Sequence, residues 1–131
     1  MGENRIKLVA ADMDGTLLNR ERKITKYTQN VIKKAMAQGV YFVPATGRAV
    51  NALPPELKEM EGIRYGIFSN GATIYDLKEE KVIYKNHFEM DRVLELMDFL
   101  KQFDLMESIS LNGQSYACLL YTSPSPRDST S

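Results

Sequence analysis

"LVAADMDGTLL", Leu8–Leu18, joins a short apolar run to two aspartates, a glycine and a threonine. A continuous apolar run is typical of a parallel β-strand whose two faces are both covered by helices, so Ile6–Ala11 is predicted to be such a strand. Asp12 and Asp14 follow at the end of that strand, where Gly15 permits a tight turn. We expect both carboxylates to point into a crevice at this end of a sheet.

The next segments alternate between helix and strand patterns. A helix beginning at a Thr N-cap is followed by a strand, then by two short helical pieces interrupted by a Pro-Pro pair, then by a third strand. This order predicts an α/β fold with a doubly wound parallel sheet and right-handed crossovers. The segments concerned are Thr25–Gln38, Val40–Thr46, Ala49–Glu61 and Tyr65–Gly71.

The pattern changes after the third predicted strand. Alternating apolar and polar residues predict a β-hairpin over Thr73–Lys85. A helix over Asp91–Phe103 and a hairpin turn at Asn112-Gly113 follow, which together indicate the start of a second, α+β unit. We therefore expect a first unit over residues 1–85, a second over residues 86–117 and a disordered tail over residues 118–131.

Polar residues follow each of the three predicted parallel strands. Asp12, Thr46 and Asn70 occupy these positions, and the carboxyl ends of neighbouring parallel strands share one edge of a sheet. Of two acids at this spacing, one can act as a nucleophile kept ionised by a divalent cation and the other as a general acid and base. The Thr46 hydroxyl and the neighbouring Gly47, at the start of a helix, form an anion site. A bare D-x-D is equally typical of a capped turn, whereas D-x-D-G-T-L directly after an apolar strand is far more specific.

Three motifs, "DMDGTLL", "PATGR" and "SNGATIYD", occur in this order within Ile6–Ala117. In them the sequence resembles the haloacid dehalogenase superfamily, and more closely its Cof-type (IIB) phosphatases. The resemblance implies that Asp12 is the nucleophile that forms an aspartyl-phosphate and that Asp14 protonates the leaving oxygen and later activates water. It also implies that the Asp12 carboxylate and the Asp14 backbone carbonyl ligate Mg²⁺, a hard cation that prefers oxygen ligands.

The same resemblance implies roles for residues after the second and third strands. The Thr46 hydroxyl and the Gly47 N–H would bind the transferring phosphoryl group. Arg48 either orients the substrate or pairs with an acid, and Asn70 either lines the crevice and binds substrate or belongs to an ordinary turn. The single histidine, His87, is interpreted as a surface or hinge residue.

The function expected from the resemblance is a Mg²⁺-dependent phosphatase acting on a small phosphorylated metabolite such as a sugar phosphate. A phosphomutase of the same fold is the first alternative, and a non-catalytic fragment is another. A phospho-accepting receiver also carries an acidic site at strand ends, but its acceptor follows a later strand. No acid ends the second or third strand here.

Composition excludes several classes of partner. The chain has 17 basic and 17 acidic residues in 131, so no net charge favours nucleic acid or an anionic membrane surface. The N-terminal segment has neither the length of a membrane span nor a signal-peptide cleavage pattern. A single cysteine, Cys118, suits a reducing compartment, which predicts a cytoplasmic protein. The sequence leaves the oligomeric state open.

The family resemblance also implies a lysine and a glycine-led acidic pair beyond the cap domain that the second unit begins. The sequence contains no Gly-Asp pair, and its last lysine is Lys101. "CLLYTSPSPRD", Cys118–Asp128, resembles the translation of a transposon-end sequencing adapter, the alternative being a natural Ser/Pro-rich tail. These features predict an inactive N-terminal fragment in which the first strand lies at the edge of the sheet.

Overall fold

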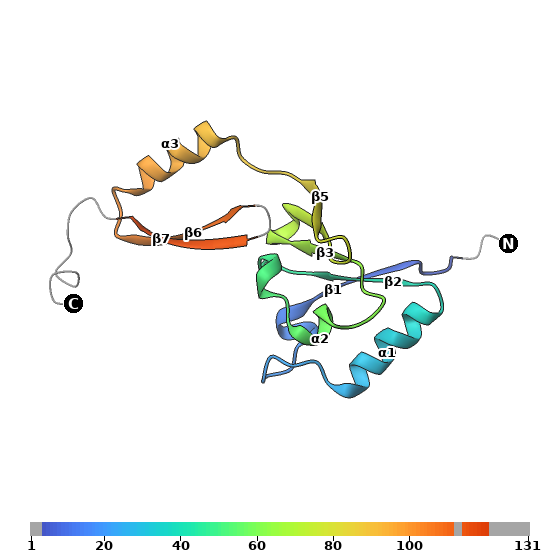
Figure 1. Cartoon of the computed structure of the whole chain (residues 1–131). Helices are drawn as coiled ribbons and strands as arrows, with labels where there is room; N and C mark the ends of the chain where they lie inside the picture. The colour runs from blue at the N-terminus through green and yellow to red at the C-terminus, as the bar shows by residue number, and fades with distance from the viewer. Residues whose placement is uncertain (1–3, 112–113, 121–131) are drawn as a thin grey trace. The chain divides into compact units, whose positions relative to one another are not determined.

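The structure, a computed structural model, describes residues 4–111 and 114–120. The chain divides into two compact units (Figure 1). The first extends to Asn86, and the second contains His87–Leu111 and, from Ser115 onward, the strand that follows.

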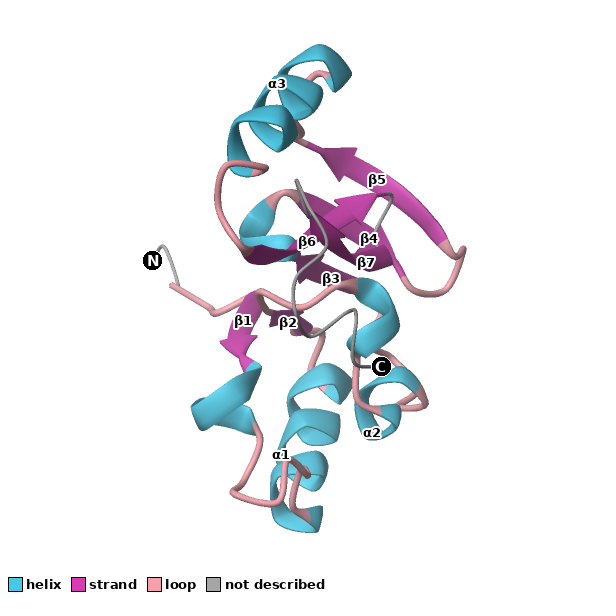
Figure 2. Ribbon diagram, turned by 90° about the vertical axis from the view of Figure 1, so that its left-hand side faces the viewer, coloured by secondary structure: helices cyan, strands magenta, loops and turns pink. Residues whose placement is uncertain are grey.

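The first unit is built on a five-stranded mixed sheet (Figure 2). The first three strands run parallel, and the last two pair antiparallel as the predicted hairpin. This confirms an α/β fold whose sheet contains parallel strands, with the antiparallel hairpin added to the same sheet. In spatial order the strands are β1 (Leu8–Asp12), β2 (Tyr41–Ala45), β3 (Tyr65–Phe68), β4 (Thr73–Asp76) and β5 (Lys81–Lys85).

Short helices connect the parallel strands. The longest, α1 (Lys26–Ala37), begins where the Thr25 hydroxyl accepts the Thr28 N–H at 3.2 Å, as the predicted N-cap requires. The predicted interruption in the second crossover is confirmed by two separate pieces, η2 (Val50–Ala52) and α2 (Pro55–Lys58). Helices α1 and α2 lie on the same face of the sheet (Figures 1 and 2). No helix among the described residues has the length and apolar character needed to cross a bilayer.

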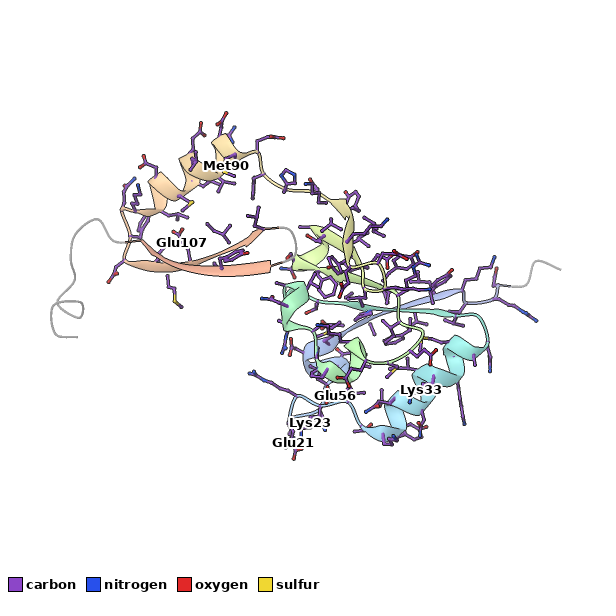
Figure 3. The ribbon with its side chains drawn as sticks, in the orientation of Figure 1. Glu21, Lys23, Lys33, Glu56, Met90 and Glu107 are labelled. Carbon is purple, nitrogen blue, oxygen red and sulfur yellow. The ribbon has the colours of Figure 1, made fainter. Side chains whose placement is uncertain are left out.

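A compact turn separates the acidic motif from α1. The Asn19 side-chain oxygen accepts the backbone N–H groups of Glu21 and Lys23, at 2.9 and 3.0 Å. The side chains of Glu21 and Lys23 extend into solvent from this turn (Figure 3). Because one asparagine side chain accepts both backbone N–H groups, this turn is stabilised by local hydrogen bonds and does not depend on packing against the core.

The hydrophobic core of the first unit is made by side chains of the sheet, of α1 and α2, and of the turn after β1. Met13, Leu57 and Phe68 are fully buried, and Phe68 meets Tyr75 edge to face with ring centroids 6.4 Å apart. Burial of such side chains stabilises by roughly 1.5–3 kcal/mol each. The other buried members are Leu18, Ile24, Ile32, Phe42, Leu53, Met60 and Ile63.

Strand β1 is less buried than its composition predicts. Among the residues that the structure describes it pairs with β2 alone and forms the edge of the sheet, as expected. Leu8 is 54% exposed and Val9 38% exposed, although neighbouring residues of a strand face opposite sides. The prediction that both faces of this strand are covered is therefore wrong for the described part of the chain. The physical reason is that a strand at the edge of a sheet has a neighbouring strand on one side only, so side chains on both of its faces stay partly exposed.

The second unit contains one helix and one two-stranded sheet. Helix α3 (Met90–Leu100) lies over β6 (Leu105–Leu111) and β7 (Gln114–Leu120), and it ends three residues before the predicted end at Phe103 (Figure 1). Its half-buried residues are Val93, Met97 and Leu100, a spacing that places them on one helical face. Residues 118–120, assigned to the tail by the sequence analysis, belong to β7. The predicted Asn112-Gly113 turn and residues 121–131 lie outside the described residues.

The β4–β5 turn is held by one buried carboxylate. Asp76 is 2% exposed, and one of its oxygens accepts the N–H groups of Lys78 and Glu79, both at 3.0 Å. Its other oxygen accepts two bonds from the Arg64 guanidinium at 3.1 and 3.2 Å. The Glu79 N–H first, then Arg64 and the Lys78 N–H, lower the pKa of Asp76 below its ordinary value of 3.8, against the opposing effect of burial.

We predict that Asp76→Asn lowers the melting temperature near neutral pH, because asparagine accepts the two N–H bonds but cannot pair with Arg64. A carboxylate whose pKa is lower in the folded state stabilises fully above its unfolded pKa and loses that effect as the pH falls through the folded one. The deficit should therefore shrink below pH 3.8. Thermal unfolding followed by circular dichroism at about pH 7 and about pH 3 measures it. The exposed Asp104→Asn is the matched control, and a pH-independent deficit would contradict the assignment.

Candidate functional site

The carboxyl ends of the three parallel strands meet in register. Asp12, the last residue of β1, is paired with Ala45, the last residue of β2, and Ala45 is paired with Ile67 in β3. Side chains that follow these positions therefore gather at one edge of the sheet. The residues predicted to form the site all lie at or just after one of these strand ends: Asp12, Asp14, Thr46, Gly47, Arg48 and Asn70.

The acidic residues lie in a tight turn that forms the start of η1 (Met13–Leu17). Asp14 has φ −69° and ψ 122°, and Gly15 has φ 77° and ψ 0°, which are the angles of a type II turn that requires glycine at its third position. Met13 is fully buried in the core and anchors the turn. The Asp12 Oδ1 accepts the Met13 N–H at 2.8 Å, and both carboxylates remain exposed to solvent.

The loop after β2 is fixed by its own hydrogen bonds. Thr46 is 6% exposed, its backbone N–H donates to the Ile67 carbonyl at 2.9 Å, and its hydroxyl accepts the Arg48 N–H at 3.1 Å. The helical piece that follows, η2, is only three residues long, so an anion here would be bound by the Thr46 hydroxyl and the backbone N–H groups of the loop and not by the N-terminus of a longer helix.

Arg48 joins the two loops. Its Nε and Nη2 donate to the two carboxylate oxygens of Asp14 at 2.9 and 2.5 Å, and its Nη1 donates to the Ala52 carbonyl at 3.4 Å. Such a two-pronged contact fixes the direction of a carboxylate as well as its position. Of the two roles that the sequence left open for Arg48, the structure has the pairing with an acid.

Asn70 lies against the loop after β2. It belongs to η3 (Ser69–Gly71), and its backbone N–H donates to the Thr46 carbonyl at 3.1 Å. The preceding Ser69 N–H donates to the Arg48 carbonyl at 2.9 Å, a contact that the sequence analysis missed. The signal for it was the polar Ser-Asn-Gly run directly after an apolar strand.

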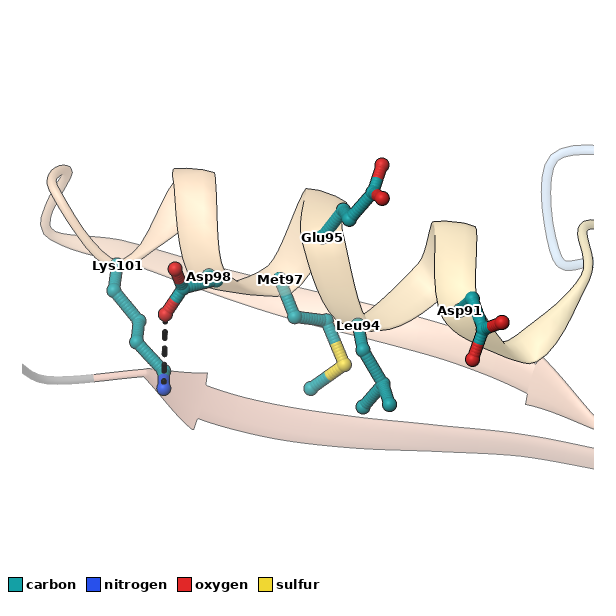
Figure 4. A pocket seen from close by; sticks show the side chains of 6 residues that line it. All are labelled: Asp91, Leu94, Glu95, Met97, Asp98 and Lys101. Atoms are coloured by element: carbon teal, nitrogen blue, oxygen red, sulfur yellow. Dashed lines mark ion pairs between the residues drawn. The ribbon is translucent and has the colours of Figure 1, made fainter.

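Two other features belong to the second unit. The exposed His87 has its Nδ1 2.9 Å from the carbonyl oxygen of the next residue, Phe88, which is a local contact. A hollow of about 510 Å³ follows α3, where Lys101 pairs with Asp98 at 3.6 Å (Figure 4). Its lining comes from α3 and the residue that caps it: Asp91, Leu94, Glu95, Met97, Asp98 and Lys101.

The oxygen donors at the strand ends suit a hard divalent cation. The Asp12 carboxylate and the backbone carbonyl of Asp14 are two such donors, while the carboxylate of Asp14 is paired with Arg48. Within residues 4–111 and 114–120, no three His, Cys, Asp or Glu side chains gather into a complete metal-binding cluster. The described residues thus fit part of a Mg²⁺ coordination shell.

Comparison with known proteins identifies relatives over most of the chain. The sequence model of the haloacid dehalogenase-like hydrolases matches residues 9–127. A proposed phosphatase of Buchnera aphidicola subsp. Schizaphis graminum is 39% identical over 113 residues, which are 84% of this chain and 40% of that protein. The 5-amino-6-(5-phospho-D-ribitylamino)uracil phosphatase YcsE of Bacillus subtilis is 37% identical over 89 residues, 65% of this chain and 36% of that protein.

Comparison with solved structures finds proteins of the same kind. The structure of a sugar phosphatase of HAD subclass IIB superposes with a TM-score of 0.71 and 27% identity, covering 95% of this chain and 46% of that one. A member of a phosphoryl-transfer superfamily superposes with a TM-score of 0.74 and 26% identity, covering 87% and 44%. The chain thus spans less than half the length of each of these relatives.

Proposed function

The chain belongs to the haloacid dehalogenase-like hydrolases, and from that premise we propose that it provides the nucleophile and the phosphate-binding loops of a Mg²⁺-dependent phosphatase. The substrate proposed is a small phosphorylated metabolite. The observation that carries the proposal is the two-pronged contact between Arg48 and Asp14, because it joins the acidic turn after β1 to the anion-binding loop after β2.

The proposed reaction has two displacements at phosphorus. An Asp12 oxygen attacks the phosphoryl group, the bond from phosphorus to the substrate oxygen breaks, and Asp14 gives that oxygen its proton. Asp14 then takes a proton from water, whose oxygen attacks the aspartyl-phosphate and releases inorganic phosphate and the Asp12 carboxylate. Arg48 holds the Asp14 carboxyl group in one direction for both proton transfers.

Charge on the transferring group has to be neutralised throughout. The Thr46 hydroxyl and the Gly47 N–H are proposed to bind the phosphoryl oxygens. The Asp12 carboxylate and the Asp14 carbonyl would hold Mg²⁺, which neutralises phosphoryl charge when bound.

The substrate class rests on the relatives. One acts on a phosphorylated ribitylaminouracil and another is a sugar phosphatase, and both names describe small phosphorylated molecules. We propose the same class here. Because this chain covers less than half of either relative, the particular substrate is not assigned.

The test compares a full-length enzyme containing this chain with residues 1–131 alone. We expect the full-length enzyme to release phosphate from p-nitrophenyl phosphate and from sugar phosphates with Mg²⁺ and to stop when EDTA is added. Residues 1–131 alone should show no turnover and should associate on size-exclusion chromatography, because β1 is an exposed apolar edge. Metal-independent turnover, or transfer to a second sugar without phosphate release, would contradict the proposal. A stable, active monomer of residues 1–131 would show that these residues suffice.

A further inference from the structure

Three consecutive residues at the end of β3 have positive φ angles. The values are 51° for Ser69, 56° for Asn70 and 94° for Gly71. Glycine adopts this region freely and asparagine more readily than most residues, but serine does so rarely. A run of this kind persists only where surrounding contacts hold it.

Two backbone hydrogen bonds join this run to the loop after β2. The Ser69 N–H donates to the Arg48 carbonyl at 2.9 Å, and the Asn70 N–H donates to the Thr46 carbonyl at 3.1 Å. The two bonds lie on either side of Gly47. The positive φ angles are therefore coupled to the conformation of the Thr46–Arg48 loop.

The Asn70 side chain covers the residue between these two bonds. A Cβ atom added to Gly47 would lie 2.8 Å from Asn70 Oδ1 and 3.4 Å from its Cγ, so the carboxamide lies directly on the glycine. Gly47 needs no positive φ of its own, so its missing side chain serves this close approach. Any side chain there would displace the carboxamide.

We propose that Asn70 is a positioning residue for phosphoryl transfer, which holds the Thr46–Arg48 loop through its backbone N–H and through the contact of its carboxamide with Gly47. This inference rests on the proposed function, and it differs from a role for Asn70 as a substrate ligand. Since Arg48 in turn holds Asp14, the contact supports both the phosphate-binding groups and the acid–base residue. A misplaced loop lowers the rate of the chemical step more than it lowers substrate affinity.

Asn70→Gly tests this role without adding backbone strain, because glycine accepts the positive φ and keeps the N–H bond to Thr46. In a full-length enzyme we expect kcat to fall by about tenfold, with KM within about twofold, because the loop loses support but no substrate contact is removed. The fall in kcat should be the same for p-nitrophenyl phosphate and for sugar phosphates. The matched control is Glu80→Gly, which relieves a φ of 52° in the β4–β5 turn and should leave turnover unchanged.

Gly47→Ala provides a second variant. The new methyl group displaces the carboxamide of Asn70, so this substitution should lower kcat in the wild type. In the Asn70→Gly background no carboxamide occupies this space, so the methyl group of Gly47→Ala should lower kcat little further. Additive losses would mean that the methyl group acts on the substrate instead, which contradicts coupling through this contact.

Hydrogen exchange gives a readout that does not depend on activity. The Arg48 N–H, bonded to the Thr46 hydroxyl, should exchange faster in Asn70→Gly than in the wild type or in Glu80→Gly. Faster exchange in a full-length protein that hydrolyses no phosphate ester would support the positioning contact and contradict the proposed function. Unchanged exchange and unchanged kcat would overturn the positioning role. A change in kcat or KM that is confined to one substrate would assign Asn70 to substrate binding, and this too would overturn the positioning role.

Discussion

Asp12→Asn is expected to remove phosphatase turnover from a full-length enzyme containing this chain, by about four orders of magnitude or more. An amide is neither a nucleophile toward phosphorus nor a good ligand for Mg²⁺. Because the Asp12 Oδ1 also accepts the Met13 N–H, and an asparagine oxygen does so equally well, the turn itself should survive. The measurement is phosphate release from an aryl phosphate, with circular dichroism to show that the fold is kept.

The matched control for this substitution is Asp104→Asn, an exposed residue of the second unit. It should retain full turnover. Substantial phosphate release by the Asp12→Asn enzyme would refute Asp12 as the nucleophile. Covalent labelling gives an independent check, because no phosphorylated protein should form in that variant.

Asp14→Asn is expected to slow turnover by about two to three orders of magnitude and to trap the phosphoenzyme. An activated leaving group such as p-nitrophenolate departs without a proton, so the aspartyl-phosphate on Asp12 still forms. Its hydrolysis requires a base to activate water, and asparagine provides none. Intact-protein mass spectrometry of the enzyme during turnover should show a larger phosphorylated fraction than in the wild type.

Arg48→Gln tests the orientation of the Asp14 carboxyl group separately from its ability to transfer protons. It removes the two-pronged contact but leaves the Asp14 carboxyl group, so both displacements should slow without accumulation of the phosphoenzyme. If Asp14→Asn does not raise the phosphorylated fraction, the acid and base roles belong to another residue.

Local features of the sequence were sufficient to predict the elements that carry the candidate site. The apolar runs Ile6–Ala11 and Val40–Thr46, the N-cap at Thr25 and the Pro-Pro interruption each depend on residues within a few positions of one another, and the structure has β1, β2, α1 and the interrupted crossover there. Gly15 is a clear case, because a type II turn needs glycine at that position whatever surrounds it.

The contacts within the site depended on residues far apart in the chain. Arg48 and Asp14 are separated by 34 positions, and sequence alone did not rank that pairing above substrate binding. The bonds of Ser69 and Asn70 to the loop after β2 also could not be read from local pattern, since they require β2 and β3 to lie side by side.

The burial of the first strand could not be predicted from its local pattern. Its apolar pattern predicted a strand over Ile6–Ala11, and the structure has β1 over Leu8–Asp12. The edge position was expected from the family resemblance, but the partial exposure of both faces of the strand was seen only in the tertiary structure, because burial depends on what packs against the strand. In the same way, the sequence placed two acids and a threonine at strand ends, while the parallel register of β1, β2 and β3 decided which of them meet. The reason is that register and packing sum many weak contacts between distant residues, whereas a turn or a helix cap is decided by a few near ones.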